Sequence, residues 1–175
     1  MTDRGEPLSS PSARTRPELW VPALGAWLAA IHAGPTEGLT VWSAAELLER
    51  ALARLASGDV DIGALDRAYR TVSADTLATQ LAGACPPEHH APVPLAGPDL
   101  LDHVCFDGST ATSTRVPVAA GDAYLDLGPM AGQLARLVGP EALGVFFESY
   151  GNPAPDARRL DFYLLLDAVS DHAIV

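Results

Sequence analysis

Three side chains that can accept or donate a proton lie within five positions of one another: Asp99, Asp102 and His103. An imidazole titrates near neutral pH, so His103 could serve as an acid, a base or a ligand for a soft metal, with a carboxylate orienting its ring. Such a group could catalyse a cyclisation, an isomerisation or an elimination in a shaped pocket. Short loops rich in Asp are also ordinary turns. A structural role for the same three residues therefore stays open.

A second group of potential ligands lies in a proline-rich stretch. Glu88, His89 and His90 could bind a metal, but adjacent histidines project in different directions, and we expect a solvated linker. Cys85 and Cys105 fit neither a disulfide framework nor a CxxC motif, so we expect reduced thiols. We predict no metal site and no cofactor.

Composition narrows the classes of partner. The chain has 175 residues, enough for one domain with a sizeable core, and carries a net charge of −11. This charge repels phosphate backbones and anionic lipids, so we expect neither nucleic acid nor a membrane as a partner. No stretch approaches the ~18 apolar residues of a membrane span, and the first twenty residues lack the apolar core of a secretory signal. We expect a soluble cytoplasmic protein.

The elements that must position the candidate groups are predicted to be mostly helices. Apolar residues recur at helical spacing over residues 19–32. Ser43 and Glu46 form the pattern of a capping box at the start of the next helix, which Gly58 ends. A shorter helix should begin at Ser73.

In the second half of the chain, the sequence pattern predicts two strands followed by helices. The strands are expected around residues 103–106 and 114–118. One helix should run over residues 123–138 with a kink at Pro129, because proline lacks a backbone donor. Two more helices are expected, one over residues 140–151 and the last one capped by Asp156.

Several short segments occur in an order and spacing that point to one family. Together they make the chain from about Leu24 to Val169 resemble the C-terminal lobe of the aminoglycoside phosphotransferases, which are antibiotic kinases with a protein-kinase-like fold. The segments are LAAIHA at 28–33, LAGPDLLDHVCFD at 95–107, GDAYLDL at 121–127, FESYG at 147–151 and RLDFYLLLD at 159–167.

The resemblance implies a mainly α (α+β) fold, the helical C-lobe of a kinase with a small β-hairpin and without the N-lobe. We expect a flexible N-terminal tail, residues 1–18, and a single kinase-like domain, residues 19–175. In the resembled family, the positions of Asp122 and Asp126 cap and brace the start of a helix. We expect the same here.

The catalytic loop departs from the family pattern. The family has His-Gly-Asp, four residues and then a metal-binding Asn, whereas this chain has Ala96, Gly97, Pro98 and His103 at the named positions. Thr114 stands where the second metal-binding Asp is expected. No phosphate-binding lysine precedes Leu24. Because the base and the metal ligands are missing, the resemblance predicts that the chain is not an ATP-dependent kinase.

The drug-binding residues of the family are only partly matched. Asp61 and Asp66 lie where the family carries a denser acidic cluster for cationic aminoglycosides, and Asp167 matches an acidic position near its C-terminus. Tyr163 is a further candidate because a phenol can donate a proton, although such tyrosines more often pack. These four residues are our predicted ligand-binding set.

Three functions follow as hypotheses. The first is a non-phosphorylating protein whose former substrate cleft binds a small molecule, a natural-product intermediate of an actinobacterium, with or without transforming it. The second is a structural pseudokinase that dimerises, or pairs with another protein, through an apolar surface near Trp20, Trp27 and residues 116–118. The third is an antibiotic-binding resistance protein.

Overall fold

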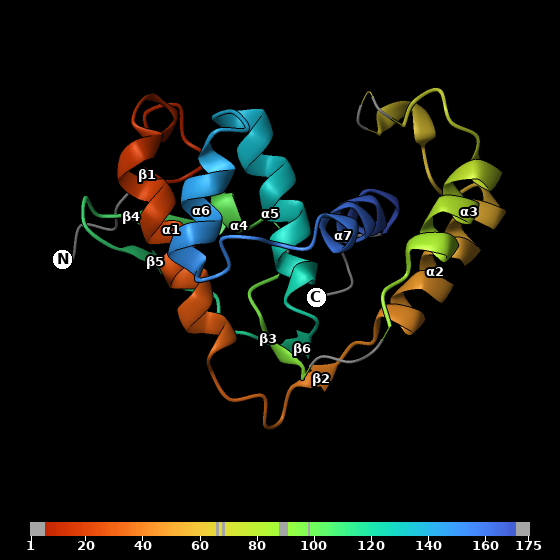
Figure 1. The fold of residues 1–175 in the computed structure, drawn as a ribbon, viewed down its shortest axis with the longest axis horizontal. Helices are drawn as coiled ribbons and strands as arrows, with labels where there is room; N and C mark the ends of the chain where they lie inside the picture. The colour runs from red at the N-terminus through yellow and green to blue at the C-terminus, as the bar shows by residue number, and fades with distance from the viewer. Residues whose placement is uncertain (1–5, 66, 68, 88–90, 98, 171–175) are drawn as a thin grey trace.

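Seven α-helices occupy most of the described chain (Figure 1). The computed structural model describes residues 6–65, 67, 69–87, 91–97 and 99–170. The helices are α1 (Pro17–His32), α2 (Ala44–Ser57), α3 (Ala74–Ala84), α4 (Leu100–His103), α5 (Tyr124–Leu137), α6 (Ala142–Tyr150) and α7 (Ala157–Val169), with 3-10 turns η1 (Ala13–Thr15) and η2 (Ile62–Ala64). The mainly α prediction is confirmed.

Six short strands form two small sheets. The strands are β1 (Glu6–Pro7), β2 (Thr40–Val41), β3 (Val93–Leu95), β4 (Val104–Phe106), β5 (Ala111–Ser113) and β6 (Ala119–Gly121). One sheet is antiparallel with the order β1-β4-β5, and the other has the order β2-β6-β3 with β2 parallel to β6. The sheet of β3 and β6 lies beneath the N-terminal end of α5 in Figure 1. It therefore sets the position of the loop that follows β3.

Local signals define the helix ends. The Ser43 hydroxyl accepts a hydrogen bond from the Glu46 amide at 3.1 Å, and the Glu46 carboxylate accepts one from the Ser43 amide, which completes the predicted capping box. Gly58 ends α2 at a φ of 80°, the left-handed region that glycine adopts without a steric penalty. Asp156 caps α7 as predicted.

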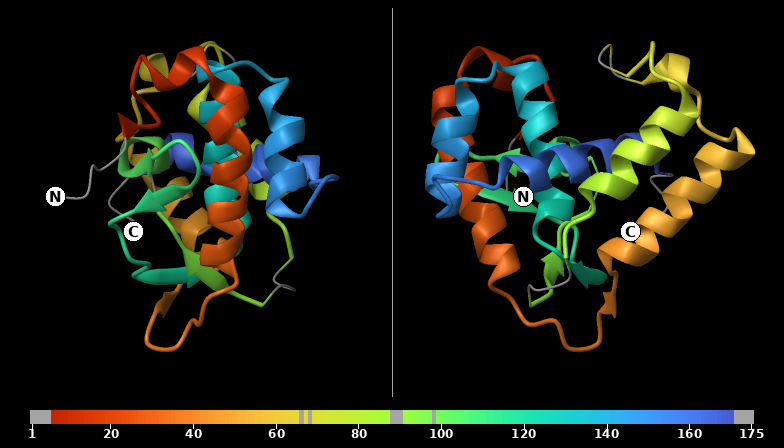
Figure 2. Two further views of the ribbon diagram at one scale, coloured as in Figure 1. Left: turned by 90° about the vertical axis from the view of Figure 1, so that its left-hand side faces the viewer. Right: turned by 45° about the vertical axis from the view of Figure 1, so that its right-hand side comes forward.

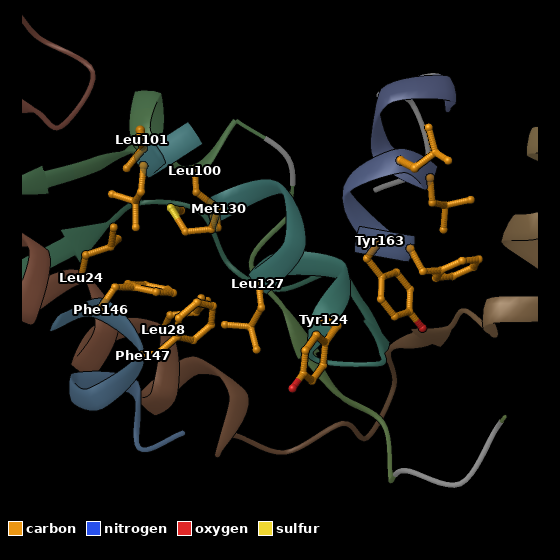
Figure 3. Close-up of a cluster of buried hydrophobic side chains, with 14 of the residues drawn as sticks. Leu24, Leu28, Leu100, Leu101, Tyr124, Leu127, Met130, Phe146, Phe147 and Tyr163 are labelled. Carbon is orange, nitrogen blue, oxygen red and sulfur yellow. The ribbon is translucent and has the colours of Figure 1, made fainter. Parts of the chain in front are cut away.

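The core is built around two helix pairs. Helix α1 packs against α6, and α5 packs against α7. Leu24 and Leu28 of α1 lie against Phe146 and Phe147 of α6 in Figure 3. A Cβ atom on Gly25 would lie 2.6 Å from the Phe146 carbonyl oxygen, so the two helices approach too closely for any side chain there. Helices α2 and α3 lie side by side beyond α7 (Figures 1 and 2).

The described part of the N-terminal segment packs against the domain. Strand β1 pairs with β4, the Leu8 amide donates to the Val104 carbonyl at 3.0 Å, and the Leu8 side chain is fully buried. The Trp20 indole donates to the Ala13 carbonyl at 2.7 Å. Residues 6–16 of the segment that the sequence assigned to a flexible tail are thus joined to the sheet and to α1.

One predicted strand is wrong. Residues 114–118 form no strand; the strands nearest to them in the chain are β5, which ends before them, and β6, which begins after them. Pro117 lacks the backbone donor that a ladder needs, and Val116 and Val118 are 79% and 61% exposed. Of the residues expected on an exposed apolar surface, Trp20 is buried instead. Within the described ranges, no helix has the length and apolar character that crossing a bilayer requires.

Candidate functional site

A buried carboxylate holds the loop that the sequence singled out. The Asp126 carboxylate accepts hydrogen bonds from the Ala96 amide at 2.7 Å and from the Gly97 amide at 3.1 Å. Its Oδ2 also lies 2.9 Å from His32 Nε2, and His32 Nδ1 lies 2.7 Å from the Tyr150 hydroxyl. Asp126 and His32 are both buried. The start of the loop is therefore held by a chain of three side chains, Asp126 of α5, His32 of α1 and Tyr150 of α6.

The sequence places these groups through ordinary local structure. His32 is the last residue of α1, and Asp126 lies in the first turn of α5. The resemblance implied that Asp126 caps and braces the start of this helix, whereas the hydrogen bonds of its carboxylate hold the loop after β3. His32, in contrast, was quoted only as part of a helix motif, and nothing local indicates that its partner lies 94 residues away.

A second network lies beside the first. The Asp122 carboxylate accepts from the Arg159 guanidinium at 2.5 Å, from the Tyr163 hydroxyl at 2.9 Å and from the Tyr124 amide at 3.0 Å. The Arg159 guanidinium lies over the Tyr124 ring at 4.1 Å. Burial, together with the Asp122 carboxylate, raises the pKa of Tyr163 above its usual value. This network joins the start of α5 to α7.

The three proton-transfer candidates lie at and just after the braced segment. Asp99 and Asp102 are exposed and His103 is half-buried, and among the described residues no hydrogen bond joins their side chains. Asp99 adopts a φ of 55°, a left-handed conformation that is uncommon outside glycine. Its backbone carbonyl accepts from the Asp102 amide at 3.0 Å. The structure brings the three residues onto one short helical turn but does not link them into a relay.

The two positions where the resemblance places magnesium ligands carry no carboxylate or amide oxygen. They hold the His103 imidazole, which is half-buried, and the exposed Thr114. In the part of the chain that the structure describes, no three His, Cys, Asp or Glu residues are grouped to hold a metal ion. Pro98 lies outside the described residues, as do Glu88, His89 and His90.

A cavity of about 560 Å³ lies between the loop of η2, helix α5 and helix α7. Its size falls in the range of small-molecule sites. Most of its lining is apolar or small, with two arginines, one tyrosine and one carboxylate. The lining residues are Ala64, Leu65, Tyr69, Arg70, Gly132, Ala135, Arg136, Leu164, Asp167 and Ala168.

The four predicted ligand-binding residues do not share one site. Asp167 lines the cavity of α5 and α7. Asp61 is exposed and caps η2, where its carboxylate accepts from the Gly63 amide at 3.0 Å. Tyr163 is buried and borders a separate pocket of about 130 Å³ near Trp42. Asp66 lies outside the described residues.

Comparison with solved structures shows the fold. The chain is similar to an aminoglycoside-3'-phosphotransferase of type VIII, with a TM-score of 0.78 and 27% identity over 95% of this chain and 66% of the other. It also resembles aminoglycoside phosphotransferase APH(3'')-Id from Streptomyces rimosus, solved with ADP and streptomycin (TM-score 0.76, 21% identity, 94% and 67% covered). Macrolide 2'-phosphotransferase MphH from Brachybacterium faecium is more distant (TM-score 0.57, 17% identity, 85% and 50% covered).

No protein-family model matches the chain, and no curated protein sequence matches it. The fold of the chain is nevertheless that of part of an aminoglycoside phosphotransferase, as the sequence motifs indicated. The chain spans 66% of the length of the type VIII structure. The structural likeness therefore confirms the resemblance and the kinase-like fold.

Proposed function

We propose that this chain, which has the fold of an aminoglycoside phosphotransferase fragment, is a non-phosphorylating protein that binds a small molecule in the cavity between η2, α5 and α7. The ligand we favour is a natural-product intermediate. Fold alone does not transmit activity, so the proposal rests on the site.

The proposal rests on one observation: the backbone of the loop after β3 is held in place, but the loop lacks the residues that catalyse phosphoryl transfer in the resembled family. The Asp126 carboxylate and His32 hold the backbone of Ala96 and Gly97. In the sequence, Ala96 and Pro98 stand where the resembled family has its His and its catalytic Asp, and neither side chain can accept a proton or bind a metal. Losing one catalytic base costs about 10²–10⁴ in rate, and losing the metal ligands removes the stabilisation of the transferring phosphoryl group as well. A rate close to that in solution is expected.

The cavity supports the binding part of the proposal. It is walled by the loop after α2 and by α7, the two segments in which the resemblance placed the drug-binding residues. Its floor is largely apolar, with Leu65, Ala135 and Leu164 in the lining. An apolar concave site with a few polar groups is the usual form of a small-molecule site.

Thermal-shift measurements with ATP and magnesium, streptomycin, a macrolide and apolar natural-product extracts test the proposal. We expect a rise in Tm with an apolar small molecule and none with ATP and magnesium. Ala135→Trp should fill the cavity and abolish the rise, whereas Ala53→Trp, on the exposed side of α2, should preserve it. Stabilisation by ATP and magnesium, or a rise that survives Ala135→Trp, would overturn the proposal.

The proposal extends to a transformation of the bound molecule by Asp99, Asp102 and His103. These residues lie on one short turn directly after the braced segment, which supports a common role. Their test is turnover of the molecule found in the binding screen, followed by liquid chromatography. If the triple alanine variant keeps the wild-type rate, the assignment fails.

One observation favours a second candidate function, association with a partner. Val116 and Val118 are exposed on the segment between β5 and β6, and Val41 of β2 is 54% exposed. Exposed apolar side chains that form a continuous patch mark interfaces. Light scattering over a range of concentrations tests this candidate: a constant monomer mass for both the wild type and Val116→Asp would exclude self-association.

A further inference from the structure

We propose that the cavity between η2, α5 and α7 selects an amphipathic anion, a molecule with an apolar body and one carboxylate. This inference rests on the proposed small-molecule function and names the charge class of the ligand. Streptomycin, which is bound together with ADP in one of the similar structures, is a cation, so the selectivity we infer is opposite to the charge of that antibiotic.

Arg136 carries the first part of the argument. It lies in the last turn of α5 and lines the cavity. One of its terminal nitrogens would lie 3.4 Å from a Cβ atom built on Gly132, one helical turn earlier, so the guanidinium folds back along α5 over the cavity wall. Among the described residues it has no ion-pair partner. A helix C-terminus favours a cation, but this role does not require the side chain to line a cavity.

Arg70 supplies the second positive charge, from the loop that follows η2. Its Nε donates to the Leu65 carbonyl at 2.7 Å, which holds the side chain against the loop of η2. Its terminal nitrogens make no hydrogen bond within the described ranges. A guanidinium fixed through Nε still offers two donors with the spacing of a carboxylate. The cavity therefore has guanidinium donors on two different elements, and both side chains are exposed to a ligand from solvent.

The charge of the lining differs from that of the protein. The whole chain has 22 acidic and 11 basic residues, whereas the described lining has two arginines and one carboxylate, Asp167. Asp167 already has an interaction partner in the structure. The other lining side chains are uncharged, and Leu65, Ala135 and Leu164 can contact an apolar body. The described lining thus carries one more positive than negative charge, which supports binding of an anion.

Calorimetric titration with octanoate, octanol and octylammonium tests the inference, because the three probes share one apolar body and differ in charge. We expect octanoate to bind at least about tenfold more tightly than octylammonium. Arg136→Gln should weaken octanoate about tenfold and leave octanol unchanged, since Arg136 makes no hydrogen bond that the fold needs. Arg14→Gln removes the same charge from an exposed position outside the lining and should change neither affinity.

Two failures are distinguishable. If octanol and octylammonium bind in a manner that Ala135→Trp abolishes, and octanoate has no advantage, the anion preference is wrong while small-molecule binding stands. If no probe, and no molecule in the thermal screen, binds in a manner sensitive to Ala135→Trp, the proposed function fails and this inference fails with it.

Discussion

His32 at the end of α1 and Asp126 at the start of α5 form a buried pair, with Nε2 and Oδ2 2.9 Å apart. The same carboxylate accepts the amides of Ala96 and Gly97, so one side chain joins two helices and the loop after β3. The pair is thus a structural centre of the domain, independent of any chemistry in the loop.

Replacing Asp126 should destabilise the fold strongly. Asp126→Asn keeps the shape but points an amide donor toward groups that are themselves donors, and breaking a buried pair of this kind costs about 3–5 kcal/mol. Urea unfolding measures the loss. Asp156→Asn is the matched control, because Asn caps a helix as well as Asp does, and it should change the free energy of unfolding by less than about 0.5 kcal/mol. Equal effects of the two changes would contradict the central role of the pair.

Two helical glycines should respond in opposite ways to alanine. A Cβ on Gly25 would meet the backbone of α6 at 2.6 Å, so Gly25→Ala must push α1 and α6 apart and should cost about 1–3 kcal/mol. A Cβ on Gly144 meets nothing within 4 Å, and Gly144→Ala should stabilise α6 by about 0.5–1 kcal/mol. Thermal unfolding of both variants measures whether Gly25→Ala lowers the stability and Gly144→Ala raises it. A stable Gly25→Ala variant would show that the helices are farther apart than described.

Leu8 tests whether the N-terminal segment belongs to the folded domain. Its side chain is fully buried, so Leu8→Ala should cost about 2–5 kcal/mol through lost burial and the cavity left behind. Leu19 is 44% exposed, and Leu19→Ala should cost much less. If Leu8→Ala is neutral in chemical denaturation, the segment contributes nothing to stability and the flexible tail predicted for residues 1–18 is supported.

Stability should fall at alkaline pH because of Tyr163. Burial beside Asp122 raises the pKa of this phenol above its ordinary value of 10.0, so the unfolded chain loses the proton first as the pH rises. The contribution is fully present below about pH 10 and is lost above it, at up to about 1.4 kcal/mol per pH unit. Unfolding in urea between pH 8 and pH 11 measures this slope.

Tyr163→Phe should lower the alkaline slope but not abolish it. Burial and the Asp126 carboxylate also raise the pKa of Tyr150, which therefore contributes in the same direction. At neutral pH the variant loses one hydrogen bond to Asp122 and about 1 kcal/mol. An unchanged slope would show that the Tyr163 phenol ionises in the folded state as freely as in the unfolded chain.

The helices could be predicted from the sequence because their ends depend on neighbouring residues. Ser43 and Glu46 lie three positions apart, and Gly58 and Asp156 act on the turn next to them. The small strands were harder, because a strand of two or three residues depends on its partner. Val116 and Val118 have high β propensity, yet no strand forms around Pro117.

The candidate site was predicted in part. The family motifs located the loop and the position of Asp126 at a helix start, since these are encoded in contiguous residues, but they did not indicate that Asp126 holds the loop. Asp126 pairs with His32 because of how α1 and α5 pack. Arg70 and Arg136 line one cavity because of how the η2 loop packs against α5. No local pattern carries that information, so only the three-dimensional arrangement shows it.

The pairing of β1 with β4 has a consequence for how the chain folds during synthesis. Glu6 is paired with Phe106, so the first strand cannot find its partner until 100 further residues have been made. At a synthesis rate of about 5–20 residues per second, β1 stays unpaired and the Leu8 side chain stays unburied for roughly 5–20 seconds. Contacts so distant in sequence also slow refolding, because a large loop must close before they form. The distance between these two strands therefore gives a lower limit for the time during which Leu8 of a nascent chain is exposed to proteases and chaperones.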